Sequence, residues 1–304
     1  MILYVTKNNK IIINKFDVIN ETYYGNKYHE IDFRQKSVNK ISDHKKNIVF
    51  GINKEKLFFF NNINRKFVEI FSIKPNKFSD FFIYDQSNVV VSDKNFILLY
   101  NFSKYLKNEL KYVYKFDSNI SEMHYHKLSK IFFIKFFNKN RIDMWKVNDK
   151  NLVYINTCNL YDCNSLNLSN QKMEFFMYNE KKEILLLYDL FGNVKSKIKI
   201  DILSNNKKKL YSNFVKWFDT NSFLLTTSKS SLDLYDFRIK SKVSSIYLNT
   251  EKITHLETSN NSERFNFNFF YVDKAKLLNV FDIRNYKNIL SINARNTIKN
   301  IFIN

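Results

Sequence analysis

The sequence predicts an all-β fold in which seven four-stranded units follow one another along the chain. Seven short apolar runs each end in an aromatic residue followed by a polar one, at spacings of 44, 40, 45, 43, 47 and 46 residues. Four short strands fit each interval, and this period is typical of a β-propeller, in which each repeat forms one blade. The seven endings are Phe16-Asp17, Phe60-Asn61, Tyr100-Asn101, Trp145-Lys146, Tyr188-Asp189, Tyr235-Asp236 and Phe281-Asp282.

The two ends of the chain predict how the ring closes. Three strands are expected within 2–33, and a single strand without companions is expected within 297–304. If that C-terminal strand becomes the inner strand of the first blade, the unit is complete and fewer strand edges stay exposed. No linker interrupts the repeats, so residues 1–304 are expected to form one domain. The other six blades are expected at 38–71, 79–114, 120–157, 164–200, 213–248 and 252–292.

Two other fold classes fit the pattern less well. A two-sheet sandwich or several small β domains would also show short alternating strands, but they predict neither the regular aromatic-polar endings nor the split of one strand and three strands. A helical solenoid would need long apolar stripes at a period of 3.6 residues, which the sequence lacks.

The composition is unusual in its turn-forming residues and its charge. Only three glycines and one proline occur among 304 residues, so the turns are expected to use Asn, Asp, Ser and Lys. The net charge of +20 indicates a polyanionic partner such as RNA or a ribosome precursor. A codon bias toward Lys and Asn gives the same charge without a partner. Both interpretations stay open, since the densest cluster is only Lys207-Lys208-Lys209.

Two units resemble a known family. Leu232–Arg238 and Leu278–Arg284 are similar to the third strand and Trp-Asp ending of WD-repeat proteins. The chain has no Gly-His dipeptide ahead of its inner strands, so the family's His-based hydrogen-bond network is not implied here. The segment 213–292 also resembles WD-repeat factors of ribosome assembly. The resemblance implies a non-catalytic scaffold that binds other proteins in a multiprotein or ribonucleoprotein complex, with ribosome biogenesis and rRNA processing as the leading hypothesis.

The candidate binding residues are Asp236, Arg238, Asp282 and Arg284, which occupy equivalent places in adjacent units. In WD-repeat substrate receptors of cullin ubiquitin ligases, paired Asp-x-Arg elements help to dock the ligase adaptor, and an Arg can make bidentate bonds to a carboxylate. A substrate receptor is therefore an alternative function. A structural role, in which these residues fix the turn after the third strand, explains them better, because Asp and Arg commonly do so in a blade.

No catalytic residue, metal ligand or cofactor site is predicted. Glu122, His124 and His126 alternate on one strand, which gives a metal-dependent enzyme as a further alternative. However, Glu122 and His126 would lie about 13 Å apart on that strand, so polar residues facing a wet central channel explain the pattern better. Cys158 and Cys163 lack a second cysteine pair and are expected to be free thiols.

The chain is expected to be intracellular, in the nucleus, nucleolus or cytoplasm. Its start shows no secretory leader, and no apolar run reaches the length of a transmembrane helix. Membrane binding is not expected, because Phe237-Arg238-Ile239-Lys240 lacks the second Arg of phosphoinositide-binding propellers. The many aromatic residues stand at the ends of apolar strands, which indicates core packing rather than base stacking.

Overall fold

A computed structural model gives the backbone of most of the chain and the side chains of its central and C-terminal parts. Side chains are described only within 80–293. The described ranges are 2–7, 10–19, 22–32, 38–44, 47–52, 56–61, 67–72, 78–84, 88–101, 109–137, 139–148, 151–159, 165–169, 171–179, 182–200, 215–227, 230–258, 267–293 and 298–303. The chain divides into two compact units, which we call the terminal unit (1–32 with 161–304) and the middle unit (33–160).

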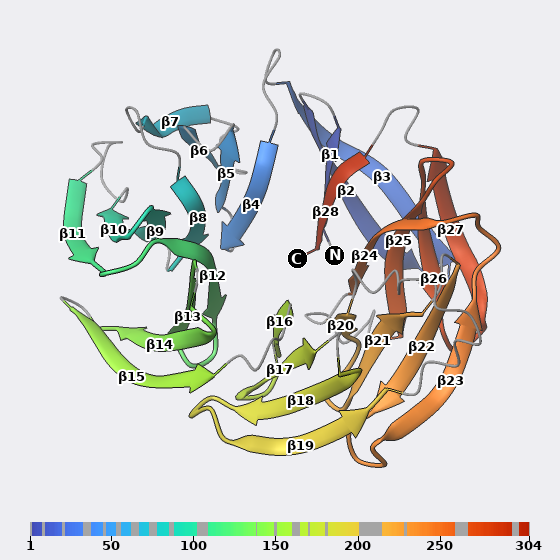
Figure 1. Cartoon of the computed structure of the whole chain (residues 1–304). Helices are drawn as coiled ribbons and strands as arrows, with labels where there is room; N and C mark the ends of the chain where they lie inside the picture. Colours follow the sequence, from blue (N-terminus) through green and yellow to red (C-terminus); the bar gives the residue numbers. More distant parts are fainter. Residues whose placement is uncertain are drawn as a thin grey trace. The chain divides into compact units, whose positions relative to one another are not determined.

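The terminal unit consists of four antiparallel sheets of four strands each (Figure 1). Its strands are β1 (Ile2–Lys7), β2 (Lys10–Ile19), β3 (Thr22–Asp32), β16 (Ser165–Leu168), β17 (Glu174–Asn179), β18 (Ile184–Asp189), β19 (Val194–Lys199), β20 (Val215–Trp217), β21 (Ser222–Thr226), β22 (Ser231–Asp236), β23 (Ser241–Tyr247), β24 (Ile253–Thr258), β25 (Asn268–Asp273), β26 (Leu277–Asp282), β27 (Lys287–Asn293) and β28 (Ile298–Ile303). The sheet orders are β28-β1-β2-β3, β16-β17-β18-β19, β20-β21-β22-β23 and β24-β25-β26-β27.

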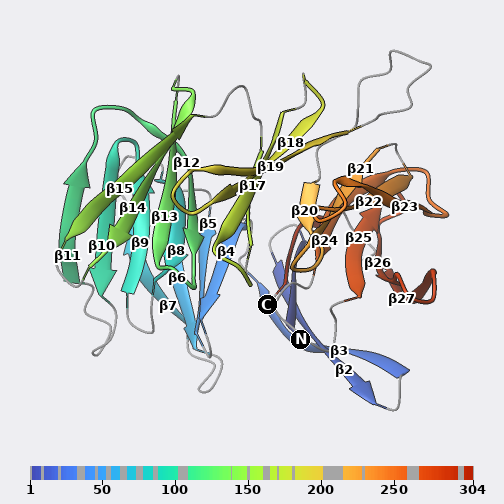
Figure 2. The same ribbon diagram turned by 90° about the horizontal axis from the view of Figure 1, so that it is seen from below.

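The middle unit contains three sheets of the same kind, in the orders β4-β5-β6-β7, β8-β9-β10-β11 and β12-β13-β14-β15 (Figure 1 and Figure 2). Their bounds are β4 (Val38–His44), β5 (Asn47–Ile52), β6 (Lys56–Asn61), β7 (Phe67–Ser72), β8 (Phe78–Ile83), β9 (Asn88–Asp93), β10 (Phe96–Asn101), β11 (Glu109–Lys115), β12 (Ile120–His126), β13 (Ile131–Phe136), β14 (Arg141–Val147) and β15 (Leu152–Asn159). The described residues thus form seven four-stranded sheets, and the predicted all-β fold is confirmed. The single domain and the number of blades around one ring stay predictions.

The C-terminal strand joins the N-terminal sheet, as the sequence predicts. β28 pairs antiparallel with β1, with Leu3 opposite Ile303 and Val5 opposite Ile301. The sheet that begins the chain is therefore completed by its last strand, which also lies next to β24 of the neighbouring sheet. Without β28, β1 would be an unpaired edge.

Neighbouring sheets within the terminal unit are linked through their first strands. The indole Nε1 of Trp217, on β20, donates to the Asn167 carbonyl on β16 at 3.0 Å. The Trp217 carbonyl in turn accepts a bond of 2.6 Å from the Thr258 hydroxyl on β24. Since these groups are largely buried, the bonds satisfy polar atoms that water cannot reach and fix the register of three adjacent first strands.

The aromatic residues of the repeat pack into the core, which confirms the sequence-based expectation for the described part of the chain. Tyr188 and Tyr235 are buried on the third strands, and each stacks on a phenylalanine of the second strand directly opposite. The ring centroids of Phe175 and Tyr188 lie 5.0 Å apart, and those of Phe223 and Tyr235 lie 5.1 Å apart. Such cross-strand aromatic pairs stabilise a sheet beyond the area they bury. They explain the recurring aromatic residue in these two sheets, whereas Tyr100 on β10 lies opposite Val89.

The described turns contain the predicted residue types, but Asn, Asp and Ser do not occupy their left-handed positions. Among the described residues, positive φ angles occur at Gly192 and at six other positions, none of which is Asn, Asp or Ser: Lys94, Lys130, Glu183, Lys240, Lys276 and Tyr286. The prediction of Lys in turns is confirmed, whereas Asp contributes to the turns through its side chain rather than through a left-handed backbone conformation. Its carboxylate accepts backbone N–H bonds within the turn, as at Asp273, which accepts from the Leu277 N–H at 2.9 Å.

Replacing Lys276 by Gly is expected to stabilise the protein by about 1 kcal/mol. Lys276 has a φ of 68°, and a side chain bearing Cβ costs roughly 1–2 kcal/mol in this region, partly offset by the greater freedom of Gly in the unfolded chain. Urea unfolding measures the change. Ala275→Gly is the matched control in the same turn and is expected to destabilise. A Lys276→Gly variant no more stable than the parent would contradict the explanation.

No helix that could cross a membrane occurs in the described residues.

Candidate interaction surface

The first predicted pair, Asp236 and Arg238, lies at the turn between β22 and β23: Asp236 is the last residue of β22, and Arg238 lies within the turn. The Asp236 Oδ1 accepts from the backbone N–H of Arg238 at 2.7 Å, and Arg238 Nη2 donates to Oδ2 at 2.5 Å. Arg238 Nε lies 3.1 Å from each carboxylate oxygen, which completes a bidentate contact. The Asp236 side chain is almost buried, whereas that of Arg238 is 69% exposed. The carboxylate therefore serves the turn, and the guanidinium lies at the surface.

The second pair, Asp282 and Arg284, repeats this geometry in the next sheet. Asp282 is fully buried and accepts from the Arg284 backbone N–H at 2.9 Å and from Arg284 Nη2 at 2.8 Å. The guanidinium carbon of Arg284 lies 4.8 Å from the ring centroid of Phe267, within the range of a cation–π contact. The structural role in the turn is thus visible for both pairs. The role of these residues in docking a ligase adaptor stays a prediction.

A third turn of the same kind was missed by the sequence-based reasoning. Asp189 ends β18, and its Oδ1 accepts from the backbone N–H groups of Phe191 at 2.8 Å and Asn193 at 2.9 Å. Phe191 occupies the position that Arg238 and Arg284 hold in the other two sheets. The signal was present in the sequence, because Tyr188-Asp189 is one of the repeat endings, but the absent Arg hid the equivalence.

These carboxylates have lowered pKa values. For Asp236, the hydrogen bonds from the Arg238 side chain lower the pKa, and burial only partly opposes them. For Asp282, burial raises the pKa, but the bonds from the Arg284 side chain and backbone outweigh it, so the pKa is again lowered. Both groups are ionised at neutral pH and hold their turns as charge-assisted acceptors.

Acid is therefore expected to weaken the fold. A carboxyl whose folded pKa is lowered contributes stability that is complete above its unfolded pKa of about 3.9 and is lost as the pH falls through the folded value. Unfolding by urea between pH 6 and pH 2 should show this loss below about pH 4. The double variant Arg238→Met, Arg284→Met should show a shallower loss, because Arg238 and Arg284 lower these pKa values. An equally steep loss in the double variant would contradict the assignment.

The same end of these three sheets exposes large apolar side chains. In a four-stranded meander, the turn between the first two strands and the turn between the last two lie at one end. We define the turn surface as the exposed large apolar and Arg side chains of those turns in the sheets β16–β19, β20–β23 and β24–β27. Its members are Met173, Phe191, Arg238, Ile239, Phe267, Arg284 and Tyr286.

The opposite ends of the same sheets are polar. Their described turns carry side chains such as Lys182, Glu251 and Lys274, and Glu251 forms an ion pair of 2.7 Å with Lys274. Tyr247, near the end of β23, is the one large apolar residue described there that is exposed. This asymmetry is not expected of a surface that only faces water, because exposed apolar residues normally occur singly. It distinguishes the turn surface as the candidate binding site.

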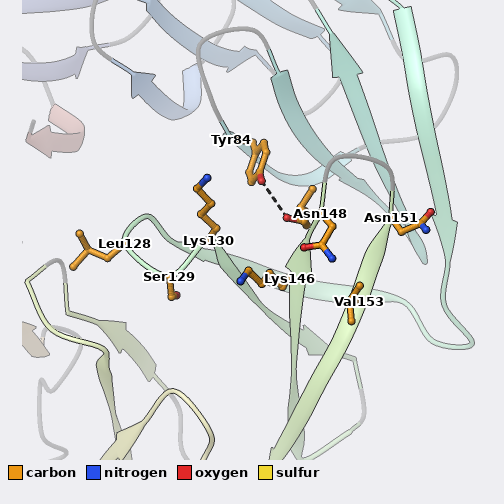
Figure 3. A pocket seen from close by; sticks show the side chains of 9 residues that line it. Tyr84, Leu128, Ser129, Lys130, Lys146, Asn148, Asn151 and Val153 are labelled. Atoms are coloured by element: carbon orange, nitrogen blue, oxygen red, sulfur yellow. Dashed lines mark hydrogen bonds between the residues drawn. The ribbon is translucent and has the colours of Figure 1, made fainter.

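In the middle unit, a cavity of about 780 Å³ opens at the end of the sheet β12–β15 that carries the turn between β12 and β13 and the turn between β14 and β15 (Figure 3). Lys130 reaches it from the turn after β12, Lys146 from β14 and Val153 from β15. The Tyr84 hydroxyl donates to the Val147 carbonyl at 3.1 Å and ties the preceding sheet to this wall. Its described lining contains two ammonium groups, Asn and Ser side chains, and apolar walls, which suit a ligand that is both acidic and apolar.

The alternative metal site is not assembled. Glu122 Oε2 lies 3.5 Å from His124 Nε2 and Glu122 Oε1 lies 3.5 Å from Lys135, whereas His126 is buried and its Nδ1 lies 2.7 Å from the Ser129 hydroxyl. Within the described residues, no group of three potential ligands could hold a metal ion.

Cys158 is a buried free thiol, as predicted. Cys163 and the cluster Lys207-Lys208-Lys209 lie outside the described residues.

Comparison with known proteins gives matches in structure but not in sequence. No family profile and no curated protein sequence matches the chain. The C-terminal WD40 domain of Sif2 is similar with a TM-score of 0.61 and 11% identity, over 93% of this chain and 78% of that domain. Raptor from Chaetomium thermophilum is similar with a TM-score of 0.63 and 10% identity, over 96% of this chain but only 26% of Raptor. The chain therefore has a WD-repeat β-propeller fold, on a sequence that has diverged widely.

Proposed function

We propose that the chain is a non-catalytic protein-interaction scaffold that binds partners through the turn surface. The observation that carries this proposal is the gathering of exposed apolar and Arg side chains at one end of three consecutive sheets, while the other end is polar. Aromatic and Arg side chains are the residues most often responsible for binding energy in protein interfaces. The fold supports the proposal, since its turns form a display surface on a rigid framework.

The turn surface is better suited to a protein than to a small ligand. Its guanidinium groups are held in place by Asp236 and Asp282, so they lose little conformational freedom on binding. Phe191 and Ile239 are more than half exposed, and their burial by a partner would release water from apolar surface. Each of the three sheets contributes exposed apolar side chains to the turn surface, so a partner that contacts several sheets would make repeated contacts.

The leading setting is a ribonucleoprotein assembly, with ribosome biogenesis and rRNA processing as the specific proposal. It is supported by the net charge of +20 and by the resemblance of the segment 213–292 to ribosome-assembly factors. A protein in such an assembly would be intracellular. Arg238 and Arg284 of the turn surface would then bind acidic proteins or RNA phosphates in addition to the apolar contacts.

Affinity purification from the native cell with mass spectrometry tests the proposal. In the double variant Phe191→Glu, Ile239→Glu, the recovered amount of the main partners is expected to fall at least tenfold, because the variant places charge on the apolar part of the turn surface. Tyr247→Glu is the matched control at the opposite end of β23, and its partners should be unchanged. Retention of the partners by the double variant would contradict the proposed surface. A partner set without ribosome-assembly proteins, or without any dependence on RNA, would refute the ribonucleoprotein setting alone.

A further inference from the structure

The outer strand β15 of the middle unit differs from every other outer strand in its lack of charge. Among the described strands, the fourth strand of each sheet is paired along one edge only, so its other edge presents backbone N–H and C=O groups. Proteins protect such edges with charged side chains, above all Lys. The sequence of β15, Leu-Val-Tyr-Ile-Asn-Thr-Cys-Asn, contains no charged residue, whereas each of the other six outer strands contains at least one. Examples from β3, β7, β11, β19, β23 and β27, in that order, are Lys27, Glu69, Lys111, Lys195, Lys242 and Lys287.

The start of β15 also exposes apolar side chains beside this edge. Val153 is 44% exposed, and Tyr154 is about half exposed although its ring packs on Trp145 at 5.3 Å. A bulge at Ile155 interrupts the ladder with β14, since Trp145 pairs with Tyr154 and Met144 pairs with Asn156. The other six sheets have similar shifts between their third and fourth strands, so the bulge does not set β15 apart. Exposed apolar side chains also occur on the outer strands β11, β19 and β23, for example Val113, Val194 and Val243, so the missing charge is the feature that distinguishes β15.

The cavity at the start of β15 indicates the charge of an occupant. Val153 pairs with Lys146 on β14, and both line the cavity together with Lys130 (Figure 3). Neither lysine has an ion pair with a described residue, and no acidic side chain is among the described residues of the lining. Asp149, in the turn before the strand, lies outside the described residues. The described side chains thus provide positive charge at one end of an uncharged, partly apolar edge.

We propose that β15 accepts an extended segment of a partner protein as a fifth strand of its sheet. Along β15 the segment is uncharged and apolar at alternate positions. Its end next to the start of β15 leaves the strand, carries acidic residues and enters the cavity that Lys130 and Lys146 line. In this mode of recognition, main-chain hydrogen bonds supply affinity and alternate side chains supply specificity. The site shares no residue with the turn surface and does not depend on the function proposed for it.

The probe for this site is a fluorescent synthetic octapeptide with two aspartates followed by alternating valine and threonine. The full chain is expected to bind it at least tenfold more tightly than a version whose alternate backbone nitrogens are methylated, because methylation removes the N–H donors. Val153→Glu should weaken binding at least tenfold, because it places a negative charge at the edge, beside the aspartates of the peptide. Val243→Glu is the matched control on β23, at a similar exposure, and should change the affinity less than twofold.

The acidic end is tested with a second pair of measurements. The double variant Lys130→Gln, Lys146→Gln should lose affinity for this peptide by about tenfold, but it should bind an asparagine version of the peptide as the parent does. Equal binding of the methylated peptide, or equal loss in Val153→Glu and Val243→Glu, would overturn strand addition at β15. If sedimentation instead shows a dimer of the chain that Val153→Glu abolishes, the edge pairs with a second copy and the proposed partner segment is wrong.

Discussion

Removal of residues 298–303 is expected to unfold the protein or leave it aggregated. These residues form β28, which pairs with β1 at five positions and lies next to β24. At about 1 kcal/mol of net stabilisation for each backbone hydrogen bond, the ladder alone contributes on the order of 5 kcal/mol. That is comparable with the whole stability of many domains. The loss would also leave β1 as an open edge, which favours association with other chains.

Urea unfolding and gel filtration measure this effect. The control is a circular permutant that joins residue 304 to residue 1 through a short linker and opens the chain within 201–214. It retains β28, and the linker is short because Ile303 pairs with Leu3. We expect the permutant to be folded and monomeric under conditions in which the truncated chain is not. A truncated chain with the stability of the parent would show that β28 does not complete the first sheet.

The fold was readable from the sequence because its evidence is local and repeated. Apolar runs such as Leu232–Asp236 alternate with turn residues, and their period needs no knowledge of distant contacts. The joining of the two ends followed from simple completion of a four-stranded unit. The paired Asp-x-Arg elements were also found, because both residues lie in one turn and their contact is local.

The features that the sequence did not reveal depend on contacts across strands and sheets. Phe175 and Phe223 lie on the strand that precedes the strand of their aromatic partners, far from them in the sequence. Only the register of the two strands shows that the rings stack. The left-handed lysines could not be distinguished from other exposed lysines, since side-chain chemistry does not demand that conformation. The turn surface appears only when exposure is known, because Phe191 and Ile239 read as ordinary apolar residues in a chain rich in them.

Replacing Trp217 by Ala is expected to destabilise the protein by about 3–5 kcal/mol, the range for loss of a large buried aromatic side chain. Trp217 is buried in a core shared by two sheets, with ring centroids 5.1 Å from Phe176 and 5.2 Å from Phe237. The substitution leaves a cavity and also removes the indole donor to the Asn167 carbonyl. Tyr247→Ala, at a side chain that is 80% exposed, is the control and should change the stability by less than about 0.5 kcal/mol.

Two milder variants separate packing from hydrogen bonding at this position. Trp217→Phe keeps most of the ring volume but loses the N–H donor, so we expect a loss of about 1–2 kcal/mol. Thr258→Val removes the bond to the Trp217 carbonyl and should cost about 1 kcal/mol. Because both bonds join the first strands of adjacent sheets, the two losses should not be additive in the double variant. Strict additivity would mean that β16, β20 and β24 are held together by apolar packing alone, and that the bonds through Trp217 merely satisfy buried polar atoms.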